Sequence, residues 1–241
     1  MLKSFNAQRI ASKFMCVLAA GLLPVWGLAQ APADPIAIGR SSLTLPDREN
    51  WKAEELDAVN IGLSGDVNMP LVMDTKKLTY RTDEKLIKAV FVARVTKGGA
   101  AGVSMTWANQ CPAVKETSAV FKADNGTPSS IDCLVVMRVN QLDTFVNSRA
   151  PLKTVFGDAK PNTKSGYYIR YAKSMGAGGY AVSEALVADD FSGMAGELVK
   201  TQSTISPAIL SWATAFGKNN AAAIDSLSGK WSIPPLAFNP K

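Results

Sequence analysis

Three glycines stand close together in the stretch SMGAGGY at residues 174–180, and a glycine cluster of this kind can cradle a phosphate. A dinucleotide-binding fingerprint built on Gly176 and Gly178 would require a third glycine three residues later, where the chain has alanine, followed by a helix. Residues 180–187 instead alternate in the manner of a strand, and the lysine of a nucleoside-triphosphate loop is missing. The pattern therefore predicts the tight turn of a hairpin, in which Gly176, Gly178 and Gly179 supply positive φ angles, with an anion-binding nest as the alternative.

Cysteine is the second residue type that could carry chemistry. The chain has three cysteines and no histidine, and Cys16 lies in an apolar N-terminal run, which leaves Cys111 and Cys133. A catalytic cysteine needs a neighbouring base, and the usual one, an imidazole, is absent from the sequence. The N-terminal segment described below indicates export, and in an exported chain such a pair forms a disulfide. We therefore expect a Cys111–Cys133 bond that stabilises the fold by about 3 kcal/mol.

Carboxylates are the remaining groups for acid-base chemistry, because a chain without histidine has no histidine-based serine triad and no usual zinc site. Adjacent acids occur at residues 54–55, 83–84 and 189–190, each where a turn or a helix start favours acid. None of these pairs is singled out for glycoside hydrolysis, and Asp189-Asp190 lacks the spaced oxygens of a calcium loop. The sequence thus predicts no metal and no cofactor, with a histidine-independent hydrolase that uses carboxylates as an alternative.

The elements that would position these groups are mainly β-strands. Alternating or β-branched stretches end at turn residues such as Asp83-Glu84 and Asn125-Gly126. The predicted strands cover residues 77–81, 86–96, 103–107, 118–122, 131–139, 166–174 and 180–187. A short helix is expected at 141–147, and a longer amphipathic helix begins at Ser206, a good N-cap, with proline after it. Together they predict an α+β fold, mainly an antiparallel sheet of about 7–8 strands in hairpins with the C-terminal amphipathic helix packed on it.

The N-terminal segment has the three parts of a secretory signal peptide: basic residues, an apolar run at residues 14–29 and small residues after it. The run is too short for a permanent span, so we expect no stable membrane insertion after cleavage at Ala29, with Ala31 as the alternative site. The predicted organisation is a signal peptide at 1–29, a flexible leader at 30–35 and a single α+β domain at 36–241, in the periplasm or secreted. Cleavage removes three basic residues and no acidic one, so the formal charge of +6 falls by half. The remaining basic residues are scattered, which argues against nucleic-acid binding.

The candidates for binding are residues of the predicted glycine hairpin and of the C-terminal segment. They are Tyr167, Tyr171, Gly176, Gly178, Gly179, Tyr180, Trp231 and Phe238. The apolar segment 231–238, held extended by prolines, is expected to lie back over the domain, with docking to a partner as the alternative. We therefore predict a non-enzymatic exported protein that binds another envelope protein or a small ligand. A structural accessory subunit of an envelope assembly is a further alternative.

Overall fold

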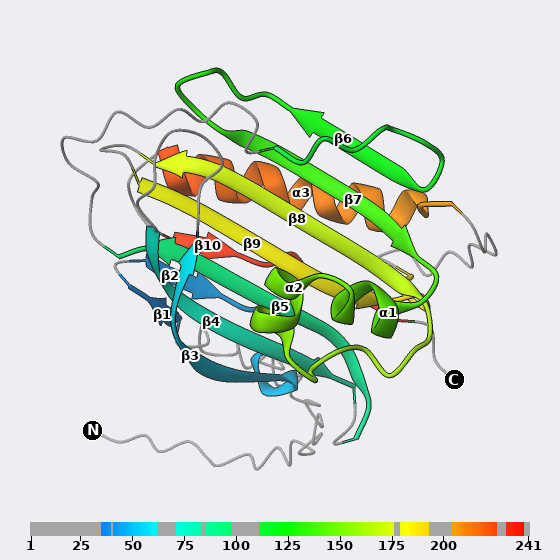
Figure 1. Cartoon of the computed structure of the whole chain (residues 1–241). Helices are drawn as coiled ribbons and strands as arrows, with labels where there is room; N and C mark the ends of the chain where they lie inside the picture. Colours follow the sequence, from blue (N-terminus) through cyan, green and yellow to red (C-terminus); the bar gives the residue numbers. More distant parts are fainter. Residues whose placement is uncertain are drawn as a thin grey trace, which may run out of the picture. The chain divides into compact units, whose positions relative to one another are not determined.

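The protein has an α+β fold built on a seven-stranded antiparallel sheet, which confirms the predicted fold class (Figure 1). The computed structural model describes residues 35–39, 41–61, 71–82, 85–97, 111–175, 179–192, 204–225 and 230–238, so the predicted signal peptide and the predicted strand at 103–107 lie outside the described residues. The strands are β1 (Ile36–Ile38), β2 (Ser41–Thr44), β3 (Trp51–Ile61), β4 (Leu71–Arg81), β5 (Ile87–Thr96), β6 (Val120–Asp124), β7 (Asp132–Val139), β8 (Gly166–Met175), β9 (Gly179–Ala188) and β10 (Lys230–Ser232). The helices are η1, a 3-10 turn (Arg48–Asn50), α1 (Leu142–Asn147), α2 (Ala150–Phe156) and α3 (Pro207–Asp225).

The large sheet has the strand order β3-β4-β5-β9-β8-β7-β6, and every neighbouring pair is antiparallel. The β8–β9 hairpin pairs Met175 with Gly179, so the predicted hairpin at the glycine cluster is confirmed. Gly176 and Gly178 themselves lie outside the described residues. The β6–β7 hairpin pairs Asp124 with Cys133, which places the predicted Asn125-Gly126 turn between two paired strands.

The central strands are covered on both faces, and this explains why their sequences are almost continuously apolar. In β5, Phe91 and Ala93 belong to the core on one face, and Val90 and Val92 belong to the core on the other. Helix α3 covers the face of Phe91, while α1 and α2 cover the face of Val90 (Figure 1). The sheet is therefore the middle layer of the fold.

Helix α3 begins where the sequence predicts. The N–H of Ile209 donates a hydrogen bond of 3.2 Å to Ser206 Oγ, and proline occupies the first helical position. Its buried face points at the sheet, where the ring of Phe216 lies 5.2 Å from that of Phe91 and 6.1 Å from that of Tyr171. The predicted amphipathic helix packed on the sheet is thus confirmed.

The C-terminal segment lies on its own domain. Strand β10 pairs in parallel with β2, which also pairs with β1, and the three form a small second sheet. Trp231 and Leu236 are only 2% and 6% exposed. The indole Nε1 of Trp212 donates hydrogen bonds of 3.1 Å to the carbonyl oxygens of Pro234 and Pro235. The expected return of this segment over the domain is confirmed.

Several elements have no counterpart among the predicted ones: β1, β2, β3 and α2, together with the first half of β4. Strand β3 is an edge strand with exposed charges, and Glu54 and Glu55 pair across the strands with Lys77 and Lys76 at 3.2 and 2.9 Å. It lacks the apolar alternation by which a strand is recognised in a sequence. Among the helices of the described residues, none has the length and apolar character of a membrane span.

Candidate functional site

The candidate site is a groove between one end of the large sheet and helix α3. Its volume is about 230 Å³. Strands β6, β7 and β8 form one wall and the second half of α3 forms the other, so segments far apart in the sequence meet here (Figure 1). The apolar lining consists of Phe121, Ala123, Leu134, Tyr171, Gly217 and Ala221. The groove therefore offers a mainly apolar surface to anything that enters it.

Gly217 leaves part of this space open. A Cβ atom at this position would lie 3.6 Å from two ring carbons of Tyr171 and 3.8 Å from Cδ2 of Leu134, which are ordinary contact distances. Close packing of the helix on the sheet therefore does not require a glycine. A glycine inside a helix costs about 1 kcal/mol relative to alanine. Gly217 therefore keeps the space above Tyr171 and Leu134 open and makes the helix about 1 kcal/mol less stable than alanine would.

Tyr171 forms the floor of the groove and is held from two sides. Its ring packs edge-on against Phe216, and its hydroxyl donates a hydrogen bond of 3.2 Å to Asp132 Oδ1. The ammonium group of Lys173 donates to the second carboxylate oxygen of Asp132, also at 3.2 Å. Asp132 thus has a partner on each oxygen, and the positive charge of Lys173 balances its negative charge.

The rim of the groove is polar and includes Thr214, Asn125 and Lys218. Thr214 Oγ1 donates to the carbonyl oxygen of Leu210 at 2.8 Å, so this hydroxyl proton is used within the helix. The side chains of Asn125 and Lys218 also line the groove and are exposed. Within the described part of the chain, neither side chain forms a hydrogen bond or an ion pair. These two side chains are the donors available to a ligand.

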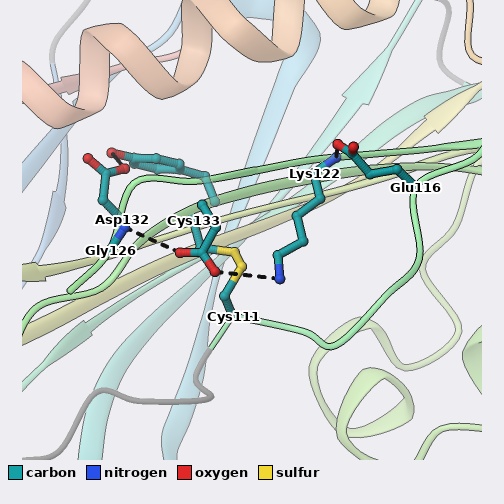
Figure 2. The surroundings of a disulfide bond; sticks show 8 residues. Cys111, Glu116, Lys122, Gly126, Asp132 and Cys133 are labelled. Carbon is teal, nitrogen blue, oxygen red and sulfur yellow. Dashed lines mark hydrogen bonds and ion pairs between the residues drawn. A yellow bond between two sulfur atoms is a disulfide. The ribbon is translucent and has the colours of Figure 1, made fainter. Parts of the chain in front are cut away.

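The predicted disulfide between Cys111 and Cys133 is present, with the Cα atoms 5.6 Å apart (Figure 2). Cys133 is fully buried in an apolar cluster on the face of the sheet opposite the groove. Because side chains alternate along a strand, its neighbours Asp132 and Leu134 lie on the groove side. The bond therefore ties the segment around residue 111 to β7, the strand that contributes Asp132 and Leu134 to the groove lining.

The other predicted binding residues do not converge on this groove. Tyr167 is buried in the core, and the guanidinium carbon of Arg138 lies 5.0 Å from the centre of the Tyr167 ring. Trp231 is buried as well, and Phe238 packs against Tyr80 at 5.8 Å. The backbone of Gly179 and Tyr180 belongs to β9, whereas Gly176, Gly178 and the side chain of Tyr180 lie outside the described part. Among the predicted residues whose side chains the structure describes, only Tyr171 lines the groove.

A buried polar cluster on the opposite face of the sheet was not predicted. Arg94 Nη2 donates to Glu184 Oε2, and the hydroxyl of Tyr168 donates to Glu184 Oε1. All three side chains are more than nine-tenths buried. Burial, and then the nearby Glu184 carboxylate, raises the pKa of the Tyr168 hydroxyl well above its ordinary value. Both oxygens of Glu184 are used within the protein, so the cluster joins β5, β8 and β9.

The sequence does carry a signal for this cluster: a single charged residue inside each of two apolar runs. Arg94 interrupts VFVARV and Glu184 interrupts AVSEALV. A charge at such a position is buried when both faces of the sheet are covered, and it then needs a partner of opposite sign. The pairing of β5 with β9 supplies that partner.

The adjacent acids at 54–55 and 189–190 have cationic partners. Asp190 accepts a hydrogen bond from Lys88, and a carboxylate oxygen of Asp189 lies 3.8 Å from the guanidinium group of Arg138. Asp83 and Glu84 lie outside the described residues. In the described ranges, no three cysteine, aspartate or glutamate side chains come together as metal ligands.

The sequence matches no protein-family model, no curated protein and no solved structure.

Proposed function

We propose that the protein is an exported, non-enzymatic binding protein that takes a small, mainly apolar ligand into the groove between β6–β8 and α3. The observation that carries this proposal is the open, apolar volume above Tyr171, which Gly217 leaves unfilled. Ligand sites in proteins are typically concave and apolar with a few polar groups at defined positions. The groove has this composition, with Asn125 and Lys218 as the free polar groups.

The size of the groove limits the ligand. An apolar cavity of about 150 Å³ is large enough to bind benzene. The groove, at about 230 Å³, has room for a single ring with one substituent or for a short branched aliphatic chain. A ligand of about ten non-hydrogen atoms in such a site binds with a Kd on the order of 0.1–1 mM.

The test is a titration of the protein with toluene, followed through the methyl NMR signals of Ala123, Leu134 and Ala221. We expect saturable shifts of these signals in the wild type. The variant Gly217→Leu fills the groove from the helix side and should abolish the shifts. The matched control is Ser211→Leu, which adds the same side chain to an exposed position of α3 that does not line the groove.

Two outcomes would contradict the proposal. One is the absence of any saturable shift in the wild type. The other is equal toluene binding by the wild type and Gly217→Leu, because that result would place the ligand elsewhere. Both variants are first compared with the wild type by circular dichroism, so that loss of binding is not confused with loss of the fold.

A further inference from the structure

We infer that the groove selects a small organic monoanion, an aryl or alkyl carboxylate whose apolar body lies above Tyr171 and whose negative group meets Lys218 and Asn125. This inference rests on the proposed function and adds the charge of the ligand. It depends on which charged side chains of the groove are paired and which are not.

The acidic side chain of the groove is already neutralised. Both oxygens of Asp132 are occupied, one by the hydroxyl of Tyr171 and one by the ammonium group of Lys173. Asp132 is the one carboxylate in the described lining, so the lining offers no unpaired carboxylate to attract a cationic ligand.

The basic side chain of the lining is not neutralised. Lys218 is exposed, follows Gly217 directly in α3, and has no ion pair within the described residues. The groove therefore carries a net positive charge at its mouth. The side-chain amide of Asn125, contributed by the β6–β7 turn, adds N–H donors. An ammonium group and an amide donor beside an apolar floor are the complement of a carboxylate attached to a small apolar body.

Charge complementarity at an exposed lysine gives a modest preference. An ion pair at a solvent-accessible site contributes little, so we expect an anionic ligand to bind about fivefold more tightly than a cationic one of similar size. The preference should shrink in high salt, because the ammonium group of Lys218 is screened there.

The experiment compares three probes of similar size: sodium benzoate, benzylamine and toluene. Each is titrated at low ionic strength into the wild-type protein, Lys218→Ala and Lys153→Ala, with the same methyl NMR signals as the readout. Lys153 is an exposed lysine on α2, which covers the opposite face of the sheet. In the wild type and Lys153→Ala we expect benzoate to bind about fivefold more tightly than benzylamine. In Lys218→Ala the preference for benzoate over benzylamine should vanish, whereas in Lys153→Ala the binding of all three probes should match that of the wild type.

The outcomes separate this inference from the proposed function. If toluene binds but benzoate binds no more tightly than benzylamine, the selection of anions is wrong and the apolar site remains. If the preference for benzoate survives in Lys218→Ala, the assignment to Lys218 is overturned. If none of the three probes binds, the proposed function fails and the inference falls with it.

Discussion

Gly217 is the residue on which the open volume of the groove depends most directly. An alanine there would make only ordinary contacts with Tyr171 and Leu134 and would remove the helix penalty of glycine. We therefore expect Gly217→Ala to raise the free energy of unfolding by about 0.5–1 kcal/mol. Urea denaturation followed by circular dichroism measures the change. A loss of stability would show that the helix packs more tightly on the sheet than these distances indicate.

Gly166 provides the contrasting case. A Cβ at this position in β8 would overlap the backbone carbonyl oxygen of Val187, which is fixed by the sheet. We expect Gly166→Ala to lower the free energy of unfolding by about 1–3 kcal/mol, because the strand must shift to admit the methyl group. The same denaturation experiment applies. If Gly166→Ala and Gly217→Ala changed the free energy of unfolding equally, the difference in space at these two positions would be contradicted.

Tyr168 makes the free energy of unfolding fall at alkaline pH. Its pKa is raised in the folded state by burial and then by Glu184, whereas an unfolded tyrosine ionises near pH 10. Above about pH 10 the folded state therefore holds more protons than the unfolded state, and stability falls as the pH rises. The contribution of Tyr168 is fully present below that pH. Burial also raises the pKa of Tyr80, which acts in the same direction.

The variant Tyr168→Phe tests this dependence. It loses the hydrogen bond to Glu184, so we expect it to be less stable at pH 7 by about 1.5–3 kcal/mol. Its stability should fall less steeply than that of the wild type above pH 10. Urea denaturation at several pH values between 7 and 11 gives both curves. Parallel curves over this range would show that Tyr168 does not titrate with a shifted pKa.

At the scale of elements, the disulfide holds β7 to a segment with little regular structure. The bond closes a loop with a sequence separation of 22 residues. We expect the double variant Cys111→Ser, Cys133→Ser to lose about 3 kcal/mol of unfolding free energy. Denaturation of this variant, and of the wild type with a reductant in the denaturant, should give the same midpoint. A variant as stable as the oxidised protein would contradict this role.

Elements with a strong local pattern could be predicted from the sequence. The apolar runs of β5 and β7, the hairpin of β8 with β9, and α3 with its Ser206 cap all have such patterns. Strand β3 could not be predicted, because its charged residues are stabilised by ion pairs with β4 that exist only after pairing. The short strands β1 and β2 depend on a partner, β10, from the other end of the chain.

The groove could be predicted only in part. Tyr171 was a candidate because it is aromatic and near the glycine hairpin, and it does line the groove. The remaining walls come from β6, β7 and α3, and no local pattern in the sequence indicates that these segments meet. Tyr167 is a candidate on the same hairpin and Trp231 is one in the apolar C-terminal segment, but both are buried core residues. Both faces of the sheet become covered only when the helices pack on it, so the local sequence does not show which aromatic residues will be buried.

At the scale of the whole molecule, the proposal of export makes a direct prediction. The sequence places cleavage after Ala29, so the exported protein should begin at Gln30. Intact mass measurement of the periplasmic fraction from a bacterial host, with N-terminal sequencing, reads this directly. A mature chain that begins at Pro32 would favour the alternative site. Full-length protein retained in the cytoplasm would contradict export.

The parallel pairing of β10 with β2 has a consequence for how the domain matures. A ribosome must synthesise nearly the whole chain before β2 gains its second neighbour. Until then Leu43, which is fully buried in the finished fold, stays accessible to water or to a chaperone. Closure of the core therefore waits for the last strand to emerge.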